Sequence, residues 1–348
     1  MSSNNAPNRV AVLDYLRGLA ALSVVFFHTD KWVHGVWIPG TLIGKCGVYA
    51  VSLFFVLSGL TLTLVYKDKP CTWPTGFLSF WKKRIQRIFP LLWLATTATL
   101  LLEEPLWSFW QVLLNYTGLF GFLDPSGDIA LGAWSIGDEL VFYAVFPFIL
   151  LLFPKKYFFF TVFALSLLLA ALYANVWLQP DVPIKQQWSA YVQPGNHLFF
   201  FLGGMAMGLY PTVLPAWSTK SWMLVALVIV VGVLYFPIGP EPSELLCGWP
   251  RLYFSLACFG LVAAMYASHL QLLASSHRLF GWLGTISYGI YLLHPLVFRV
   301  LKALNVRSLQ MPEYWLIPAT VLVTLLVSHV SWHWFEKPLQ QSKWPEKE

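Results

Sequence analysis

Charged side chains are scarce in this sequence. Lysine, arginine, aspartate and glutamate supply 11% of the 348 residues, whereas soluble globular domains carry about 25%. Apolar residues make up 57%, and the mean hydropathy is +0.63. This balance excludes a soluble domain of ordinary size, a disordered chain and a collagen-like chain. The net charge of +6 is spread thinly between apolar stretches, so we also exclude the dense basic face of a nucleic-acid-binding protein.

Cysteine is scarce too. The four cysteines are scattered, without the spacing of a disulfide scaffold or a zinc site. His329 and His333 lie four residues apart, a spacing that can hold a metal ion on a helix. No HExxH motif and no suitably placed carboxylate accompanies them, so we expect no metal.

Long apolar runs are abundant. A membrane-spanning helix needs about 20 mostly apolar residues. The ranges that qualify are approximately 9–28, 47–66, 88–102, 139–153, 157–177, 197–210, 222–237, 251–268, 282–301 and 314–334. We therefore expect an all-α fold, a polytopic transmembrane helical bundle of about ten spans. It forms one integral-membrane domain over residues 1–348, with a short polar tail from about 336.

The basic residues predict the orientation. Six lysines and arginines lie between residues 67 and 87, and such loops face the cytoplasm under the positive-inside rule. With about ten spans, both termini are then cytoplasmic. An eleventh apolar segment, 107–123, would begin and end on the outer side, so we interpret it as re-entrant or interfacial. The stretch 103–138 around it contains no lysine or arginine, which is typical of an outer loop.

The first span carries three ionisable residues: Asp14, Arg17 and His28. His28 follows Arg17 by eleven positions, which on a helix is three turns plus about 20° and ~16 Å along the axis. Asp14 precedes Arg17 by three residues, at a spacing that permits an ion pair. Because charge at membrane depth is costly, this single polar face predicts a functional site. The alternative is that the side chains only reach toward the membrane interfaces.

The second span contains recurrent small residues, including Gly47 and Gly59. This pattern predicts that a neighbouring helix packs closely against it.

The segment FWKKRIQRIFP, residues 80–90, contains Arg84 and Arg87 on one side of an expected helix, with Lys83 beside them. Paired guanidinium groups bind phosphate oxygens in a bidentate manner that lysine does not reproduce. The alternative is a basic anchor at the cytoplasmic membrane surface.

Two further segments place polar groups at the start of the fourth span and within the ninth span. AWSIGDELVFY supplies Trp134, Ser135 and Glu139, and Ser135 with Glu139 alternatively resembles a helix-capping arrangement. SYGIYLLHPL places Tyr288 and His294, together with Ser287 and Tyr291, within the ninth span.

Taken in order, six segments covering nearly the whole chain resemble the membrane-bound acyltransferase-3 family. They are LDYLRGLAALSVVFFH, GVYAVSLFFVLSG, the RxxR of Arg84 and Arg87, WSIGDELVFY, ISYGIYLLHPL and FEKPL. The first contains the Arg-x10-His pair of the family as Arg17 and His28. Tyr15 stands where the family has glycine, and Leu140 where it often has a second acid. Neither departure removes a candidate catalytic group.

The resemblance implies transfer of an acyl group, most commonly acetyl, to an extracytoplasmic carbohydrate or cell-envelope glycan. Our hypothesis takes acyl-CoA, with acetyl-CoA as the first choice, as the co-substrate on the cytoplasmic side. The expected catalytic residues are His28, Arg17, Asp14 and Glu139; the expected donor site is Arg84, Arg87 and Lys83; the expected acceptor site is Ser135, Trp134, Tyr288 and His294. His28 is either a general base or a nucleophile that carries the acyl group. Outer tryptophans (Trp32, Trp37, Trp134 and Trp188) would stack on a sugar or form an interfacial belt.

The resemblance also sets the expected surroundings. A bacterial inner membrane is the common setting of the family, so the partners are the lipid bilayer and a carbohydrate or glycolipid acceptor, with no nucleic acid. A homo-oligomer is compatible with the sequence. Because the sequence ends soon after its last span, a second transfer step would need a separate periplasmic protein.

Two other classes compete with this hypothesis. A transporter or flippase of a glycan, lipid or acyl group would also have about ten spans and intramembrane charges, but we find no inverted repeat. A structural membrane subunit without chemistry is disfavoured by the aligned Asp14, Arg17 and His28. Release of free CoA thiol from acyl-CoA separates the enzyme from the other two classes.

Overall fold

The computed structural model describes residues 10–35, 40–69, 75–103, 107–152, 156–239 and 241–341. Trp37, one of the tryptophans expected near a sugar, lies outside these residues, as does the end of the polar tail. Within the described ranges the regular structure is helical, and no strand occurs. The expected all-α fold is therefore confirmed.

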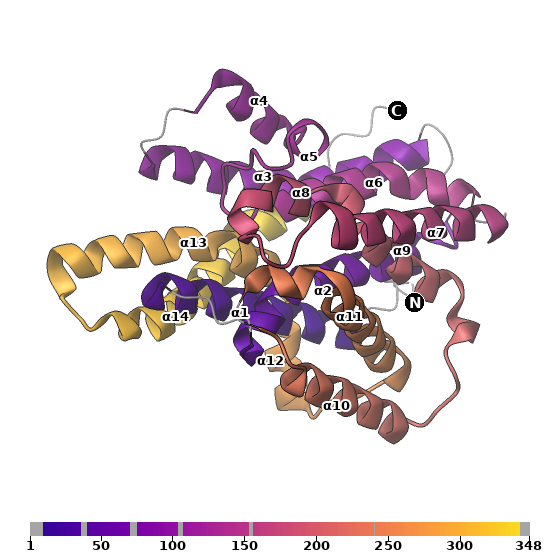
Figure 1. The fold of residues 1–348 in the computed structure, drawn as a ribbon. Helices are drawn as coiled ribbons and strands as arrows, with labels where there is room; N and C mark the ends of the chain where they lie inside the picture. The colour runs from indigo at the N-terminus through magenta and orange to yellow at the C-terminus, as the bar shows by residue number, and fades with distance from the viewer. Residues whose placement is uncertain are drawn as a thin grey trace.

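Fifteen α-helices make up the described architecture (Figure 1). They are α1 (Ala11–His34), α2 (Leu42–Tyr66), α3 (Thr75–Leu102), α4 (Phe109–Thr117), α5 (Phe120–Leu123), α6 (Trp134–Leu152), α7 (Lys156–Leu172), α8 (Trp188–Tyr191), α9 (Pro194–Leu209), α10 (Thr219–Tyr235), α11 (Gly248–Ser268), α12 (Ala274–Thr285), α13 (Ser287–Leu304), α14 (Leu316–Ser331) and α15 (Lys337–Gln341).

Eight helical segments in the described part of the chain are long and apolar enough to cross a membrane. They contain α1, α2, α3, α6, α7, α11, α13 and α14. Adjoining turns extend α7, α13 and α14, and the last segment also includes α15. The other two ranges expected to span form α9 and α10, which have 16 and 17 residues. A helix of 16 residues is ~24 Å long, shorter than the ~30 Å hydrocarbon core.

The apolar segment 107–123 does not form one continuous helix. It forms α4 and α5, and Gly118 between them adopts a φ of 74°, a left-handed conformation that ends α4. The nine residues of α4 reach only ~14 Å. Neither piece is long enough to span a bilayer, in keeping with a re-entrant or interfacial segment.

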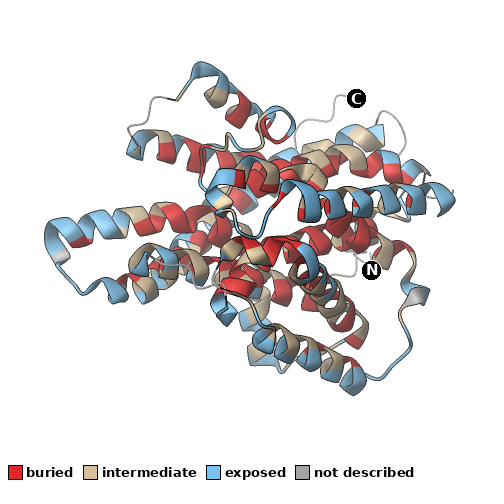
Figure 2. Ribbon diagram, viewed as in Figure 1, coloured by how far each residue is buried: buried red, intermediate tan, exposed pale blue. Residues whose placement is uncertain are grey.

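Apolar side chains on the outer helices face outward. Buried residues gather where the helices meet in the middle of the bundle, whereas α7 and α10 are largely exposed along their outer faces (Figure 2). Their exposed side chains include Leu165, Leu168, Leu224 and Leu227, and α14 adds Leu322 and Leu326. Apolar patches of this extent are stable against lipid rather than water, so we describe the chain as an integral membrane protein.

α2 and α9 pack with their backbones in contact. A Cβ atom built on Gly59 would lie 2.0 Å from the carbonyl oxygen of Phe201, and one built on Gly204 would lie 2.0 Å from that of Val56. Only glycine fits at either position. The close packing expected from the small residues of the second span is confirmed, and α9 is the partner helix.

Two boundaries differ from those expected. α3 begins at Thr75, ahead of the expected span 88–102, and Arg84 and Arg87 lie on this helix as expected. The ninth span is interrupted at Ile286, where α12 ends and α13 begins. The interruption lies beside a contact with α1, since a Cβ on Gly284 would lie 2.3 Å from the carbonyl oxygen of Asp14. Ser287 then donates its hydroxyl hydrogen to the Gly284 carbonyl at 2.9 Å.

Candidate active site

Three cavities follow one another along α1. The terminal cavity, of about 470 Å³, is lined by Val10 and Asp14 and also by Gln340, so both ends of the described chain lie at one end of the bundle. The arginine cavity, of about 90 Å³, begins at Arg17. The histidine cavity, of about 200 Å³, is lined by His28. His28 follows Arg17 by eleven positions, which places these last two cavities ~16 Å apart along the helix.

Neighbouring cavities have walls in common. The terminal and arginine cavities share the residues Arg17, Thr61, Arg87, Ser287 and Tyr288. The arginine and histidine cavities share Val51 and Tyr291. The three therefore form a series, and Val51 and Tyr291 stand at the partition between its last two members.

Arg17 is held in place by hydrogen bonds from both ends of its guanidinium group. Nη1 donates to Oδ1 of Asp14 at 3.0 Å, and Nη2 donates to the Leu57 carbonyl at 3.3 Å and to the Thr61 hydroxyl. The expected ion pair between Asp14 and Arg17 is thus present. Asp14 is buried, so it orients Arg17 and compensates its charge.

Arg84 and Arg87 project from α3 into the arginine cavity and join Arg17 there. The Arg84 guanidinium carbon lies 5.8 Å from the centre of the Tyr143 ring, within cation–π range. Arg84 Nε is buried and has no hydrogen-bond partner among the described residues. Three guanidinium groups and one such unused donor make this cavity suited to an anion. Lys83 is exposed on the same helix and does not line the cavity.

Glu139 also lines the arginine cavity and does not line the histidine cavity. Glu139 and His28, both expected to be catalytic, therefore line different cavities. The suggested cap made by Ser135 and Glu139 is not formed. Instead, the backbone N–H of Trp134 donates to Oδ2 of Asp128 at 3.2 Å, at the start of α6. Burial raises the pKa of Asp128 to about 7.

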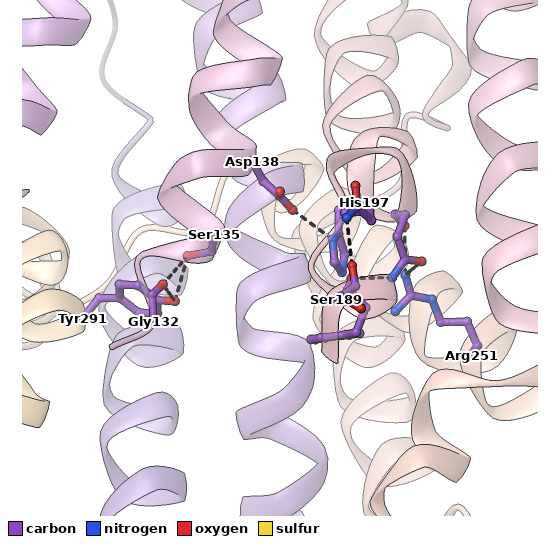
Figure 3. Close-up of polar contacts among 10 residues, drawn as sticks. Gly132, Ser135, Asp138, Ser189, His197, Arg251 and Tyr291 are labelled. Atoms are coloured by element: carbon purple, nitrogen blue, oxygen red, sulfur yellow. Dashed lines mark hydrogen bonds and ion pairs between the residues drawn. The ribbon is translucent and has the colours of Figure 1, made fainter. Parts of the chain in front are cut away.

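Ser135 and Tyr291 form a small hydroxyl cluster at the partition. Their hydroxyl oxygens are 2.7 Å apart, and both lie within hydrogen-bonding distance of the Gly132 carbonyl, at 3.1 and 2.9 Å (Figure 3). Ser135, which we expected at the acceptor, lines the arginine cavity and not the histidine cavity. Tyr288, which we expected at the acceptor, lies in the arginine cavity and donates its hydroxyl hydrogen to the Ile88 carbonyl at 2.8 Å.

The histidine cavity is rich in aromatic side chains. Its wall includes Phe27, Trp32, Trp134, Trp188, Tyr191 and Tyr291, together with His28 and Lys31. The Trp134 and Trp188 rings meet edge to face with centroids 5.8 Å apart. Of the tryptophans expected near a sugar, the three that are described all line this one cavity.

His28 and His294 form a pair across the bundle. Nδ1 of His28 lies 2.8 Å from Nε2 of His294, and Nδ1 of His294 lies 3.1 Å from the Ile290 carbonyl oxygen. Trp32 stacks on both rings, with centroids 5.2 and 5.8 Å away. His294 is 1% exposed and does not line the cavity itself.

A second buried polar cluster escaped the sequence analysis. Asp138 projects from α6 on a different side from Ser135 and meets His197 of α9, with Oδ2 2.9 Å from Nδ1 (Figure 3). Nearby, Nη2 of Arg251 donates to both oxygens of Asn196 at 3.1 Å. Charged residues inside apolar runs were the available signal, but the sequence does not show which of them meet. Among the described residues no group of three or more His, Cys, Asp or Glu is placed to hold a metal.

Comparison with known proteins gives a family and several relatives. The family model described as an acyltransferase domain matches residues 10–333. The putative peptidoglycan O-acetyltransferase YrhL of Bacillus subtilis is 26% identical over 94% of this chain and 54% of its own length. The peptidoglycan O-acetyltransferase OatA of Listeria monocytogenes is 25% identical over 96% of this chain and 56% of its own.

A putative O-acetyltransferase of Staphylococcus aureus, SACOL0978, is 25% identical over 94% of this chain and 57% of its own length. The chain thus spans about half the length of the curated relatives it matches. No solved structure matches it. Since the family model matches residues 10–333, nearly the whole chain, the chain belongs to the acyltransferase-3 family.

Proposed function

We propose that this protein is an integral-membrane O-acyltransferase. It moves an acyl group, most commonly acetyl, from cytoplasmic acyl-CoA to a hydroxyl of an extracytoplasmic cell-envelope glycan, in a bacterial inner membrane. The observation that carries the proposal is the series of cavities along α1, with guanidinium groups in the middle and a histidine among aromatic rings at the far end. The names of the relatives support an acetyl group and a glycan such as peptidoglycan.

The donor is assigned to the terminal and arginine cavities. CoA carries several phosphate groups, and Arg17, Arg84 and Arg87 offer the planar donors that bind phosphate oxygens best. Lys83 lies outside the cavity and contributes positive electrostatic potential to it. Val10 and Gln340, near the two ends of the described residues, line the terminal cavity. The positive-inside rule favours a cytoplasmic position for the basic segment 82–87. The slender pantetheine arm then extends toward the partition at Val51 and Tyr291.

The acceptor is assigned to the histidine cavity. Trp32, Trp134 and Trp188 present flat apolar faces on which a sugar ring can stack. A sugar hydroxyl held beside His28 gives its proton to the imidazole as its oxygen attacks the thioester carbonyl carbon. The tetrahedral intermediate collapses, the carbon–sulfur bond breaks, and the CoA thiolate takes a proton to leave as free thiol. Glu139 serves on the donor side, among the arginines.

Purified protein in detergent tests the proposal directly. We would measure acetyl-CoA binding and thiol release, with water or a chito-oligosaccharide as acceptor, for wild type, His28→Ala and the double variant Arg84→Ala/Arg87→Ala. We expect wild type to bind and release thiol, His28→Ala to bind without release, and the double variant to lose binding. If wild type binds neither acetyl-CoA nor a longer acyl-CoA, the proposal is wrong and a transport function takes its place.

Rapid quenching separates the two roles of His28. A general base leaves no label on the protein after mixing with radiolabelled acetyl-CoA, whereas a nucleophile traps an acyl-imidazole.

A further inference from the structure

We propose that His294 is a positioning residue that holds His28 in the tautomer with its proton on Nδ1, so that the lone pair of His28 Nε2 is presented to the substrate. This inference rests on the proposed function, in which His28 accepts the proton of the acceptor hydroxyl. It assigns to His294 a role other than the sugar contact expected from the sequence.

The donors and acceptors of the His28–His294–Ile290 chain follow from the Ile290 carbonyl, the one group in it that cannot donate. The Ile290 carbonyl oxygen is only an acceptor, so Nδ1 of His294, 3.1 Å away, must carry a hydrogen. A neutral imidazole carries one N–H, so Nε2 of His294 is an acceptor. Nδ1 of His28 lies 2.8 Å from that atom and must therefore donate. Nε2 of His28 is left with its lone pair, the state needed by a base or a nucleophile.

The Ile290 carbonyl can accept this bond in addition to the backbone bond of its own helix. It lies four residues before His294 on α13, and a carbonyl oxygen has two lone pairs, so it accepts from the side chain of His294 as well as from a backbone N–H.

The surroundings exclude a different role for His294. Both of its nitrogens are engaged, and it is 1% exposed, so it has no atom left for a sugar. Trp32 packs on both imidazole rings, which lie 15° from parallel. This packing fixes the planes in which the hydrogen bond forms.

Among the described residues, the titratable groups that face His28 include no acid. They are Lys31 on its own helix, His294 and Tyr291 on α13, and Tyr191 of α8. The described lining of the histidine cavity includes no carboxylate. A neutral imidazole thus does the orienting that a carboxylate performs in serine-hydrolase triads. It selects the tautomer without adding negative charge beside an acyl group in the membrane.

The test compares two substitutions of His294. His294→Phe keeps the ring but removes the acceptor, and we expect kcat to fall about 100-fold while the KM for acetyl-CoA stays within about twofold. His294→Gln restores an acceptor oxygen and should recover most of kcat. His329→Phe is the matched control, because His329 accepts a hydrogen bond from Trp282 in another part of the bundle. It should leave both constants unchanged.

A second readout does not depend on activity. Nitrogen-15 NMR of histidine-labelled protein in detergent, assigned with His28→Gln, reports which nitrogen of His28 carries hydrogen. We expect the Nδ1–H form in wild type and a shift toward Nε2–H in His294→Phe. Wild-type kcat in that variant, or an unchanged His28 tautomer, would overturn the inference. If wild type has no activity with any acyl-CoA, the proposed function fails, while the spectrum still decides the role of His294.

Discussion

The carboxylate of Asp138 lies 2.9 Å from the imidazole of His197, and both side chains are fully buried between α6 and α9. The Trp134 and Tyr191 rings, which line the histidine cavity, pack against His197 with centroids 5.4 and 5.2 Å away. This buried polar pair therefore contributes to the stability of the fold and also supports two side chains that line the candidate site.

Loss of one partner should therefore be costly. We expect Asp138→Leu and His197→Leu each to lower the free energy of unfolding by roughly 3 kcal/mol, because each leaves a buried polar group without its partner. The double variant should be less destabilised than the sum of the two. Thermal unfolding in detergent measures all three. The exposed pair of Asp30 and His34, 3.0 Å apart, is the control, and Asp30→Leu should leave Tm nearly unchanged.

Arg84 should tolerate lysine poorly. The flat guanidinium group lies within cation–π range of the Tyr143 ring and offers forked donors to the cavity, and an ammonium group offers neither feature in the same way. We expect Arg84→Lys to raise the KM for acetyl-CoA about tenfold with a smaller change in kcat. Lys83→Ala, one position away on the exposed side of α3, should change KM much less. If the two variants change KM equally, the basic segment only sets the orientation in the membrane and Arg84 has no specific role in donor binding.

The partition between the arginine and histidine cavities predicts a blocking substitution. Val51 is buried and lines both cavities. A larger, aromatic side chain at this position should close the passage between the arginine cavity and the histidine cavity. We expect Val51→Phe to retain acetyl-CoA binding and to lose at least 90% of acyl transfer (roughly 1.4 kcal/mol on the barrier). Val51→Ala should retain transfer. Full activity in the phenylalanine variant would show that the acyl group takes another route.

Asp128 should make stability depend on pH. Burial raises its pKa to about 7, from an ordinary value near 3.8. The folded protein then binds a proton more tightly than the unfolded chain does. The associated stabilisation is complete below about pH 4 and is lost as pH rises toward and through 7. We expect Asp128→Asn to flatten this part of the Tm-against-pH curve between pH 4.5 and 8. A curve with the wild-type slope would contradict the assignment.

The sequence predicts the helices well because long apolar runs permit little else in a bilayer. It also predicts the pair of Asp14 and Arg17, because residues three positions apart on a helix lie on the same face. The interruption at Ile286 was not predictable, because it accompanies the contact between Gly284 and α1. A pattern within one segment carries no information on which distant backbone will meet it.

The contacts between residues of separate helices could not be predicted from the sequence for the same reason. His28 and His294 are 266 positions apart, and Asp138 and His197 are 59 apart. Helical periodicity gives the face on which each residue lies but not the helix that this face meets. Glu139 illustrates the consequence: its chemistry was evident, whereas its place among the arginines required the packing of α3 against α6 and α13.

The glycine contact between α2 and α9 also bears on motion. With Gly59 and Gly204 bringing backbone against backbone, no layer of side chains remains between the two helices that could rearrange to let them slide. We expect the two helices to move as one unit, together with the site residues of α2. In the proposed reaction, entry of the donor and the glycan would then need displacement of the surrounding helices, among them α3 and α13, which line the arginine cavity.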